Sequence, residues 1–322
     1  MKRIVCSVLL VALLVGLTSC LISSNERFGV ERVGRARVGV GYRVCVDGNL
    51  AFVTHNDGAS IVDVSDPENP NEVAIIETPE AAFGVFAADG FAYLQDVQRG
   101  MLVVDVSDPE HPATLGSIRL SGSIADIVAE DGFAYVASRE NGLHVVDVRD
   151  PARPVKVNGA YPHSSRVEGI AKLGDIIYLA CPGGVQVVDV SDPASPSRLR
   201  TLPRTSSANG VAVGNGVLAV ACHGGGLRVF DATNPQAPRY VASFTDGHEA
   251  LDVSISNDYI AVADNMDGVR LFGLDVNLDL IEIGQYKTGG ATHDVDCADG
   301  YIYLADASAG LLILQPSEEA GT

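Results

Sequence analysis

The sequence predicts an all-β protein, a seven-bladed β-propeller with four strands per blade, and three observations predict it. The motif around Asp105 returns at a constant interval of 42 residues, with its aspartate at Asp63, Asp105, Asp147, Asp189 and Asp231. Two further steps reach Gly273 and Gln315, where the apolar strand persists without the aspartate, and a glycine stands five residues before each of the seven positions. Short apolar segments bounded by Gly, Pro, Asn and Asp fill each interval, and four-stranded units at this period are typical of propeller blades.

Residues 1–19 have the features of a signal peptide. Lys2 and Arg3 precede an apolar run at 4–17 that is too short for a membrane span. The run ends in Leu17-Thr18-Ser19-Cys20, which resembles the bacterial lipobox. This resemblance implies that Cys20 becomes the lipidated first residue, that residues 20–26 form a tether, and that the protein is an extracytoplasmic lipoprotein of the outer membrane or cell surface. A plain secretory signal that happens to contain a cysteine is the alternative.

The third copy illustrates the strands of one repeat. Strands are expected at 124–129, 133–138 and 143–148, followed by a more polar fourth strand near 155–160. Paired-helix repeats can share this period, but the Val, Ile, Tyr and Phe enrichment and the Gly and Pro punctuation exclude them.

The ring is expected to close through the N-terminal segment. Seven copies of the first three strands are present, but only six fourth strands follow them, and residues 28–38 match a fourth strand placed before the first copy. Pairing this strand with the C-terminal three removes the exposed sheet edges. The propeller is therefore predicted to span 27–316, before a disordered tail at 317–322. An open solenoid is the alternative.

Four cysteines of the predicted propeller occupy related repeat positions. Cys45 and Cys297 are six repeats apart, and Cys181 and Cys222 end equivalent strands in consecutive repeats. An oxidising compartment would permit disulfides. Equivalent strands of neighbouring blades are usually too far apart for a disulfide, so small buried thiols are favoured.

The repeated residues resemble those of a known family. The segments 61–67, 102–109 and 187–193, which read Ile-Val-Asp-Val-Ser-Asp-Pro or a close variant, resemble the LVIVD repeat of bacterial and archaeal extracytoplasmic proteins. The resemblance implies a β-propeller at the cell surface or envelope, and it implies no shared catalytic residues. Gly273 and Gln315 depart from the pattern.

The repeated polar residues are interpreted as structural. An Asx-Pro-x-x-Pro segment follows five copies, beginning at Asp66, Asp108, Asp150, Asp192 and Asn234. Asx side chains cap turns by accepting hydrogen bonds from backbone N–H groups, and proline fixes φ. One binding site does not need five copies, so these residues and the Asp63 series are expected to shape turns.

Residues that differ between copies are the better candidates for function. Carboxylates and imidazoles are expected in the loops around one mouth of the central channel, and the candidates are Asp126, Glu168, His223, His248, Asp252, Asp264, His293, Asp294 and Asp306. His293 and Asp294, with Asp252 and Asp306, make the best single cluster. Such a cluster could hold a divalent cation such as Ca²⁺, or perform general acid/base chemistry. The alternative is that these loops are simply polar.

Composition and motifs favour a binding protein over an enzyme. The formal net charge is −19, which disfavours nucleic acid as a partner and favours cations or basic partners. No HExxH, nucleophile-elbow, P-loop or EF-hand spacing occurs. The expected function is a lipid-anchored, non-catalytic binding or assembly scaffold that contacts an envelope protein or glycan. The ligand considered for the channel mouth is a cation or a small molecule. The alternative is an envelope hydrolase or lyase that uses the acidic mouth.

Overall fold

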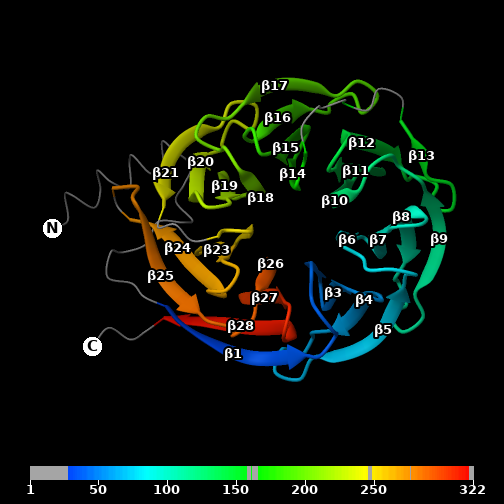
Figure 1. Ribbon diagram of the computed structural model, residues 1–322, viewed down its shortest axis with the longest axis horizontal. Helices are drawn as coiled ribbons and strands as arrows, with labels where there is room; N and C mark the ends of the chain where they lie inside the picture. Colours follow the sequence, from blue (N-terminus) through cyan, green and yellow to red (C-terminus); the bar gives the residue numbers. More distant parts are fainter. Residues whose placement is uncertain (1–27, 158–160, 162–165, 246–248, 276, 319–322) are drawn as a thin grey trace.

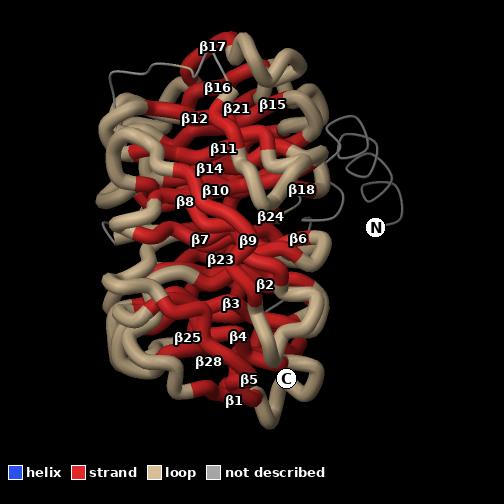
Figure 2. The backbone as a smooth tube through the Cα atoms, turned by 90° about the vertical axis from the view of Figure 1, so that its right-hand side faces the viewer, coloured by secondary structure: helices blue, strands red, loops and turns tan. Residues whose placement is uncertain are grey.

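The computed structural model describes residues 28–157, 161, 166–245, 249–275 and 277–318. They form seven four-stranded antiparallel sheets arranged in a ring (Figure 1). Seen from the side, strands occupy the middle of the ring and loops form its two faces (Figure 2). The predicted seven-bladed β-propeller is confirmed. Among the described residues, none forms an apolar helix of membrane-spanning length.

Each blade uses its four strands in chain order from the channel outward, apart from the last blade. The first strands, which line the channel, are β2 (Val44–Asp47), β6 (Val85–Ala88), β10 (Ile124–Glu130), β14 (Gly169–Leu173), β18 (Ala208–Gly214), β22 (Asp252–Ile255) and β26 (Thr292–Ala298). The second strands are β3 (Leu50–His55), β7 (Phe91–Asp96), β11 (Phe133–Ser138), β15 (Ile176–Ala180), β19 (Val217–Cys222), β23 (Ile260–Ala263) and β27 (Tyr301–Asp306).

The outer half of each blade contains the repeated motif and the more exposed edge. The third strands are β4 (Gly58–Asp63), β8 (Gly100–Asp105), β12 (Gly142–Asp147), β16 (Gln186–Asp189), β20 (Gly226–Asp231), β24 (Val269–Leu274) and β28 (Gly310–Glu318). The fourth strands are β5 (Asn71–Glu77), β9 (Ala113–Ile118), β13 (Val155–Lys156), β17 (Ser197–Thr201), β21 (Arg239–Phe244), β25 (Leu280–Tyr286) and β1 (Phe28–Ala36).

Strand β1 closes the ring as expected. It pairs antiparallel with β28, from Phe28 opposite Glu318 to Ala36 opposite Leu311, in the sheet ordered β1-β28-β27-β26. We number the blades in chain order, from blade 1 (β2 to β5) to blade 7 (β26 to β28 with β1). Strands from the beginning and the end of the described chain therefore share blade 7 (Figure 1). Strand β28 runs to Glu318, two residues beyond the predicted end of the propeller at 316, because Phe28 and Gly29 extend the pairing. In the third blade, β13 is shorter than the segment predicted at 155–160, and residues 158–160 lie outside the described residues.

The hydrophobic core is divided among the blade interfaces. Seven clusters of buried side chains are present, and each joins the facing surfaces of two neighbouring blades. At the interface between blades 7 and 1, Leu311 and Ile313 pack with Val53 and Val62, and all four are fully buried. Burying one such side chain contributes about 1.5–3 kcal/mol. Both faces of each sheet are covered, which explains the consecutive apolar residues of the second and third strands.

The cysteines are free thiols. Cys181 and Cys222 are buried, and Cys45 and Cys297 are half-buried. The Sγ atom of Cys45 accepts a hydrogen bond from the backbone N–H of Ala87 in the next blade, at 3.4 Å. Cys181 and Cys222 are therefore the small buried thiols that the sequence favoured, whereas Cys45 and Cys297 are less buried than expected.

Candidate functional site

Seven residues at the start of the first strands form one ring around the channel mouth. Each lies opposite the same position of its blade's second strand, as Asp294 lies opposite Ala305, Asp126 opposite Ala137, and Arg43 next to Thr54. We call these seven residues the mouth ring; in blade order they are Arg43, Gly84, Asp126, Gly169, Gly210, Asp252 and Asp294. The ring therefore contains one cation, three carboxylates and three glycines.

Arg43 lies among the carboxylates of this ring. Its Nη1 atom is 2.7 Å from Oδ1 of Asp294 and 3.8 Å from Oδ1 of Asp252, and its Nη2 atom donates to the carbonyl oxygen of Glu168 at 3.3 Å. The side chain of Arg43 is 20% exposed, and that of Asp294 is 5% exposed. One guanidinium thus connects first strands from blades 1, 6 and 7 and the segment that precedes β14 in blade 4.

The carboxylates also bind backbone N–H groups of the following blade. Asp294 accepts a hydrogen bond from the N–H of Val44 at 2.8 Å, and Asp126 accepts one from the N–H of Ile170 at 3.1 Å. One layer deeper, Asp296 accepts from the N–H of Val46 at 2.9 Å. Each of these bonds joins the first strands of two neighbouring blades. The carboxylates therefore satisfy backbone donors that have no partner within their own sheet.

Gly210 provides space for one of these carboxylates. A Cβ atom at Gly210 would lie 2.4 Å from Oδ1 of Asp252. Real Cβ atoms do not approach an oxygen so closely, so a side chain here would displace Asp252. Glycine at position 210 of the mouth ring is therefore a packing requirement of Asp252.

The environment of the mouth ring shifts the charges within it. Burial opposes the charge of Arg43, but Asp294, Asp126 and Asp252 together raise the pKa of its guanidinium. Burial raises the pKa of Asp126, and Arg43 partly offsets that shift. Burial and the neighbouring Asp294 raise the pKa of Asp252 well above its usual value. Burial therefore favours the protonated forms of Asp126 and Asp252, while Arg43 favours their charged forms.

Two predicted residues lie beside the mouth ring. Glu168 forms ion pairs with Arg139, at 3.2 Å, and with Arg166. The Nδ1 atom of His293 lies 3.1 Å from the carbonyl oxygen of Gly41, and because a carbonyl can only accept, Nδ1–H donates this hydrogen bond. The ring of His293 also stacks on Tyr42, with centroids 6.0 Å apart. Tyr42 also contacts Phe83, with ring centroids 4.8 Å apart. Blades 7, 1 and 2 thus contribute three neighbouring rings at the mouth.

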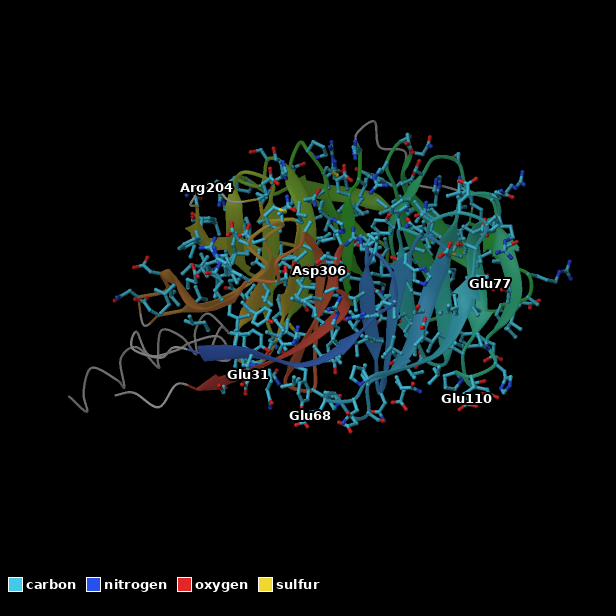
Figure 3. All side chains as sticks on the ribbon, turned by 60° about the horizontal axis from the view of Figure 1, so that its bottom comes forward. Glu31, Glu68, Glu77, Glu110, Arg204 and Asp306 are labelled. Carbon is cyan, nitrogen blue, oxygen red and sulfur yellow. The ribbon has the colours of Figure 1, made fainter. Side chains whose placement is uncertain are left out.

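The remaining candidates have local roles. Asp306, which is labelled in Figure 3, is fully buried and accepts hydrogen bonds from Ser308 and from the N–H of Ala309. These bonds shape the turn between β27 and β28. Asp264 is buried beside Arg270, with 3.1 Å between Oδ2 and Nη1. The partners described for Asp306 and Asp264 lie in the same blade as the carboxylate that they bind. His223 lies 4.0 Å from Glu249 in an exposed pair, and His248 lies outside the described residues.

The repeated aspartates shape turns, as the sequence indicated. In the series that begins at Asp63, Oδ1 accepts the N–H two residues later, from Ser65 at 2.9 Å to Thr233 at 2.9 Å. The second series does the same from Asp66 to Asn234. The hydroxyl and N–H of Ser107 lower the pKa of Asp105. Both series are structural.

The channel is a polar cavity of about 300 Å³, whose lining includes the charged members of the mouth ring and Asp296. The described residues contain no group of three or more His, Cys, Asp or Glu side chains placed to hold a metal ion. Arg43 occupies the place among the carboxylates that a cation would take. The ion pair of Arg43 and the hydrogen bonds of Asp294 and Asp126 to backbone N–H groups connect the blades at the channel mouth.

Sequence reasoning did not find Arg43, although it is the centre of this site. The turn between β3 and β4 has two residues, between His55 and Gly58, whereas the corresponding turn between β27 and β28 has three, between Asp306 and Gly310. The residues before this turn in blade 1 are therefore shifted by one position relative to the interval of 42. Counting back from Asp294 in steps of 42 reaches Tyr42 instead of Arg43, so the comparison of repeats overlooks Arg43. The short turn was the signal that could have revealed the shift.

The fold and the site define a class of protein, a closed seven-bladed β-propeller whose acidic channel mouth is held by an internal ion pair. The LVIVD repeat family matches residues 39–78, 81–119, 121–159, 166–200 and 289–318. These segments make up more than half of the chain and fall in blades 1, 2, 3, 4 and 7. The protein therefore belongs to the LVIVD repeat family. No curated protein sequence matches it.

Solved structures agree on the fold. The WD40 repeats of RRP9 superpose with a TM-score of 0.72 at 12% identity, covering 92% of this chain and 98% of that one. U3-55K gives 0.71 at 11% identity, and the computationally designed Ika8 protein gives 0.63 at 8%; each covers 91% of this chain and 98% of its own. Similarity at these identities concerns the fold alone.

Proposed function

We propose that this protein is a lipid-anchored, non-catalytic scaffold of the cell envelope that binds a partner through the face on which the channel mouth lies. The observation that supports this proposal is the internal pairing of the mouth ring. Arg43 pairs with Asp294 and Asp252, and backbone N–H groups donate to Asp294 and Asp126, which leaves the loops around the ring as the accessible part of this face. An envelope protein or glycan is the expected partner.

The aromatic residues of this face favour binding. Phe83 is 36% exposed at the mouth, beside Tyr42 and His293. Aromatic side chains are enriched at binding surfaces because they bury a large area with few rotatable bonds. The alternative of a hydrolase or lyase would use Asp126 or Asp252 as a general acid, but their engagement with Arg43 and with backbone donors favours a structural role for them.

Crosslinking in cells tests the binding face. A photoreactive amino acid replaces Phe83 in one strain and Glu110 in another, because Glu110 lies in the turn after β8 on the opposite face. We expect a discrete adduct from position 83 and none from position 110. Equal adducts from both positions, or an adduct from position 110 alone, would show that the mouth face is not the binding surface.

Membrane fractionation tests the anchor. Cleavage before Cys20 and lipidation of its thiol would place the protein in the membrane fraction, and Cys20→Ser removes the acceptor sulfur. We expect the parent in the membrane fraction and Cys20→Ser in the soluble extracytoplasmic fraction. A parent protein that is entirely soluble would contradict the anchored location.

A further inference from the structure

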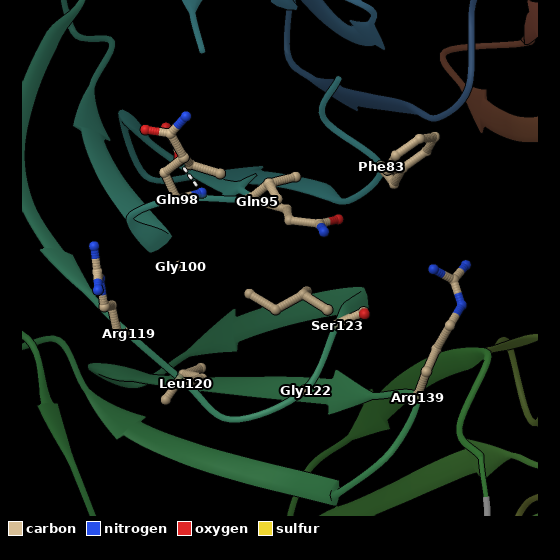
Figure 4. Close-up of a pocket in the computed structure, with 12 residues that line it drawn as sticks. Phe83, Gln95, Gln98, Gly100, Arg119, Leu120, Gly122, Ser123 and Arg139 are labelled. Atoms are coloured by element: carbon tan, nitrogen blue, oxygen red, sulfur yellow. Dashed lines mark hydrogen bonds between the residues drawn. The ribbon is translucent and has the colours of Figure 1, made fainter. Parts of the chain in front are cut away.

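A pocket between blades 2 and 3 opens on the same face as the channel mouth. It has a volume of about 380 Å³, and its walls are the turn between β7 and β8, the connection from β9 to β10, and the side chains of Phe83 and Arg139 (Figure 4). We call it the interblade pocket. This volume lies at the lower end of the range for small-ligand sites, which suits a ligand the size of a dipeptide.

Gln95 is a buried polar side chain without a partner in this pocket. It is 6% exposed, its Oε1 atom is enclosed, and its carboxamide makes no hydrogen bond to any described residue. Figure 4 shows the side chain directed into the pocket, between Phe83 and Ser123. Leaving such a group unpaired costs about 1–3 kcal/mol. A carboxamide carries one acceptor and two donors, so a peptide amide, which carries one of each, is complementary to it.

One guanidinium that lines the interblade pocket, that of Arg119, is exposed and has no ion-pair or hydrogen-bond partner among the described residues. Arg139 binds Glu168 through Nε and also lines the pocket. The carboxylate of the pocket, Asp96, is already engaged by Arg99 at 2.6 Å. Arg119 and Arg139 lie at opposite ends of the pocket (Figure 4), and Arg139 is paired with Glu168, so Arg119 is the guanidinium that can bind a carboxylate with paired N–H donors.

The pocket also has an apolar part. Val97 is 53% exposed and Phe83 is 36% exposed, and Leu120 also lines the pocket. We propose that the interblade pocket binds a peptide that carries a carboxylate next to an amide and an apolar side chain. Arg119 would bind the carboxylate, Gln95 the amide, and Phe83 with Val97 the apolar side chain. This inference rests on the proposed function and names the ligand chemistry of that face.

Binding to the purified protein is measured by isothermal titration calorimetry with three short peptides. N-acetyl-alanyl-leucine has a free terminal carboxylate, N-acetyl-leucyl-glutamate amide has a side-chain carboxylate, and N-acetyl-leucyl-glutamine amide has neither. We expect at least one charged peptide to bind about tenfold more tightly than the uncharged one. Preference for the first identifies a free peptide end, and preference for the second identifies an internal acidic segment of a partner. Equal binding of all three, or no binding, would overturn the proposal.

Variants separate a binding role from a structural one. Arg119→Gln and Gln95→Leu are each expected to weaken binding of the preferred peptide about fivefold or more. Gln95→Leu should leave the melting temperature unchanged or raise it, because an unpaired buried carboxamide is removed. Arg153→Gln changes an exposed arginine on another face and should leave binding unchanged. A Gln95→Leu protein that binds as well as the parent would contradict the assignment.

Glucuronate tests whether the ligand is a peptide. This sugar carboxylate has no amide and should bind more weakly than the preferred peptide, and tighter binding of glucuronate would overturn the peptide assignment.

Two further outcomes keep this inference separate from the proposed function. If no peptide binds while the crosslink from position 83 still forms, the inference fails and the binding face stands. Loss of that crosslink with peptide binding intact would contradict only the proposed partner.

Discussion

Asp296 shows how a single residue of the channel connects packing to pH. Its Oδ2 atom accepts a hydrogen bond from Val46 in blade 1, and its Oδ1 atom accepts one from the N–H of Cys297 at 2.8 Å. Burial in the channel outweighs these bonds, and with the nearby Asp294 it raises the pKa of Asp296 from 3.8 to about 6. Asp296 therefore links blades 7 and 1, and its contribution to the free energy of unfolding depends on its protonation.

The sign of this dependence follows from the pKa difference. Between pH 3.8 and about 6 the folded state holds a proton on Asp296 that the unfolded state has lost, so the contribution of this residue to stability falls as pH rises through that window. Asp296→Asn removes the titration. We expect the stability of the variant relative to the parent to increase between pH 4 and pH 7 by on the order of 2 kcal/mol, measured by urea unfolding.

A control variant isolates the carboxyl group. Val46→Ala changes the same pair of strands without a titratable group, so its stability relative to the parent should be constant over this pH range. A constant difference for Asp296→Asn as well would show that the carboxyl titrates alike in the folded and unfolded states.

At the scale of one element, the turn between the second and third strands depends on its glycine. Gly268 has φ +82°, and a Cβ atom there would lie 2.1 Å from the carbonyl oxygen of Tyr286 in the fourth strand. The glycine thus combines a left-handed backbone with close approach of the neighbouring strand. All seven repeated glycines have positive φ.

Gly268→Ala is therefore expected to destabilise the protein by about 2–4 kcal/mol, because the new Cβ atom meets backbone that cannot move freely. Gly183→Ala is the matched control, since a Cβ atom there meets nothing within 4 Å and the backbone is not left-handed. Thermal unfolding of both variants measures the difference. Equal melting temperatures would show that the close approach at Gly268 has no energetic consequence.

The turns also explain what could be predicted at this scale. The interval of 42 residues and the glycine before each third strand were sufficient to predict the blades, because both reflect local backbone geometry. Arg43 escaped because one short turn displaced it from the interval. Gln95 and Arg119 are 24 residues apart and vary between copies, so only the folded arrangement of β7 and the segment after β9 reveals that they share a pocket.

At the scale of the whole molecule, ring closure depends on one strand from the N-terminal segment. Removing residues 1–38 deletes β1 and leaves β28 as an exposed edge with unpaired backbone groups. We expect this truncation to aggregate or to lose its cooperative melting transition, whereas removal of residues 1–26 should leave a folded monomer. Circular dichroism melting and size-exclusion chromatography measure both properties.

Adding the missing strand in trans provides the control. A synthetic peptide of residues 27–38 should restore folding by pairing with β28, while a scrambled peptide should not. A truncated protein that is as stable as the longer form would contradict the role of β1 in closing the ring.

The central claim is that Arg43 and the mouth-ring carboxylates hold the first and last blades together. Arg43→Met and Asp294→Asn, singly and combined, form a double-mutant cycle measured by urea unfolding. Each single change should destabilise the protein by about 2–4 kcal/mol, because it leaves a mostly buried charge without its partner. The double variant should lose about 1–3 kcal/mol less than the sum of the two. The exposed pair Arg149 and Asp147 serves as the control, and the losses of its two variants should add, because solvent screens an exposed ion pair. Additive losses at Arg43 and Asp294 would contradict the account.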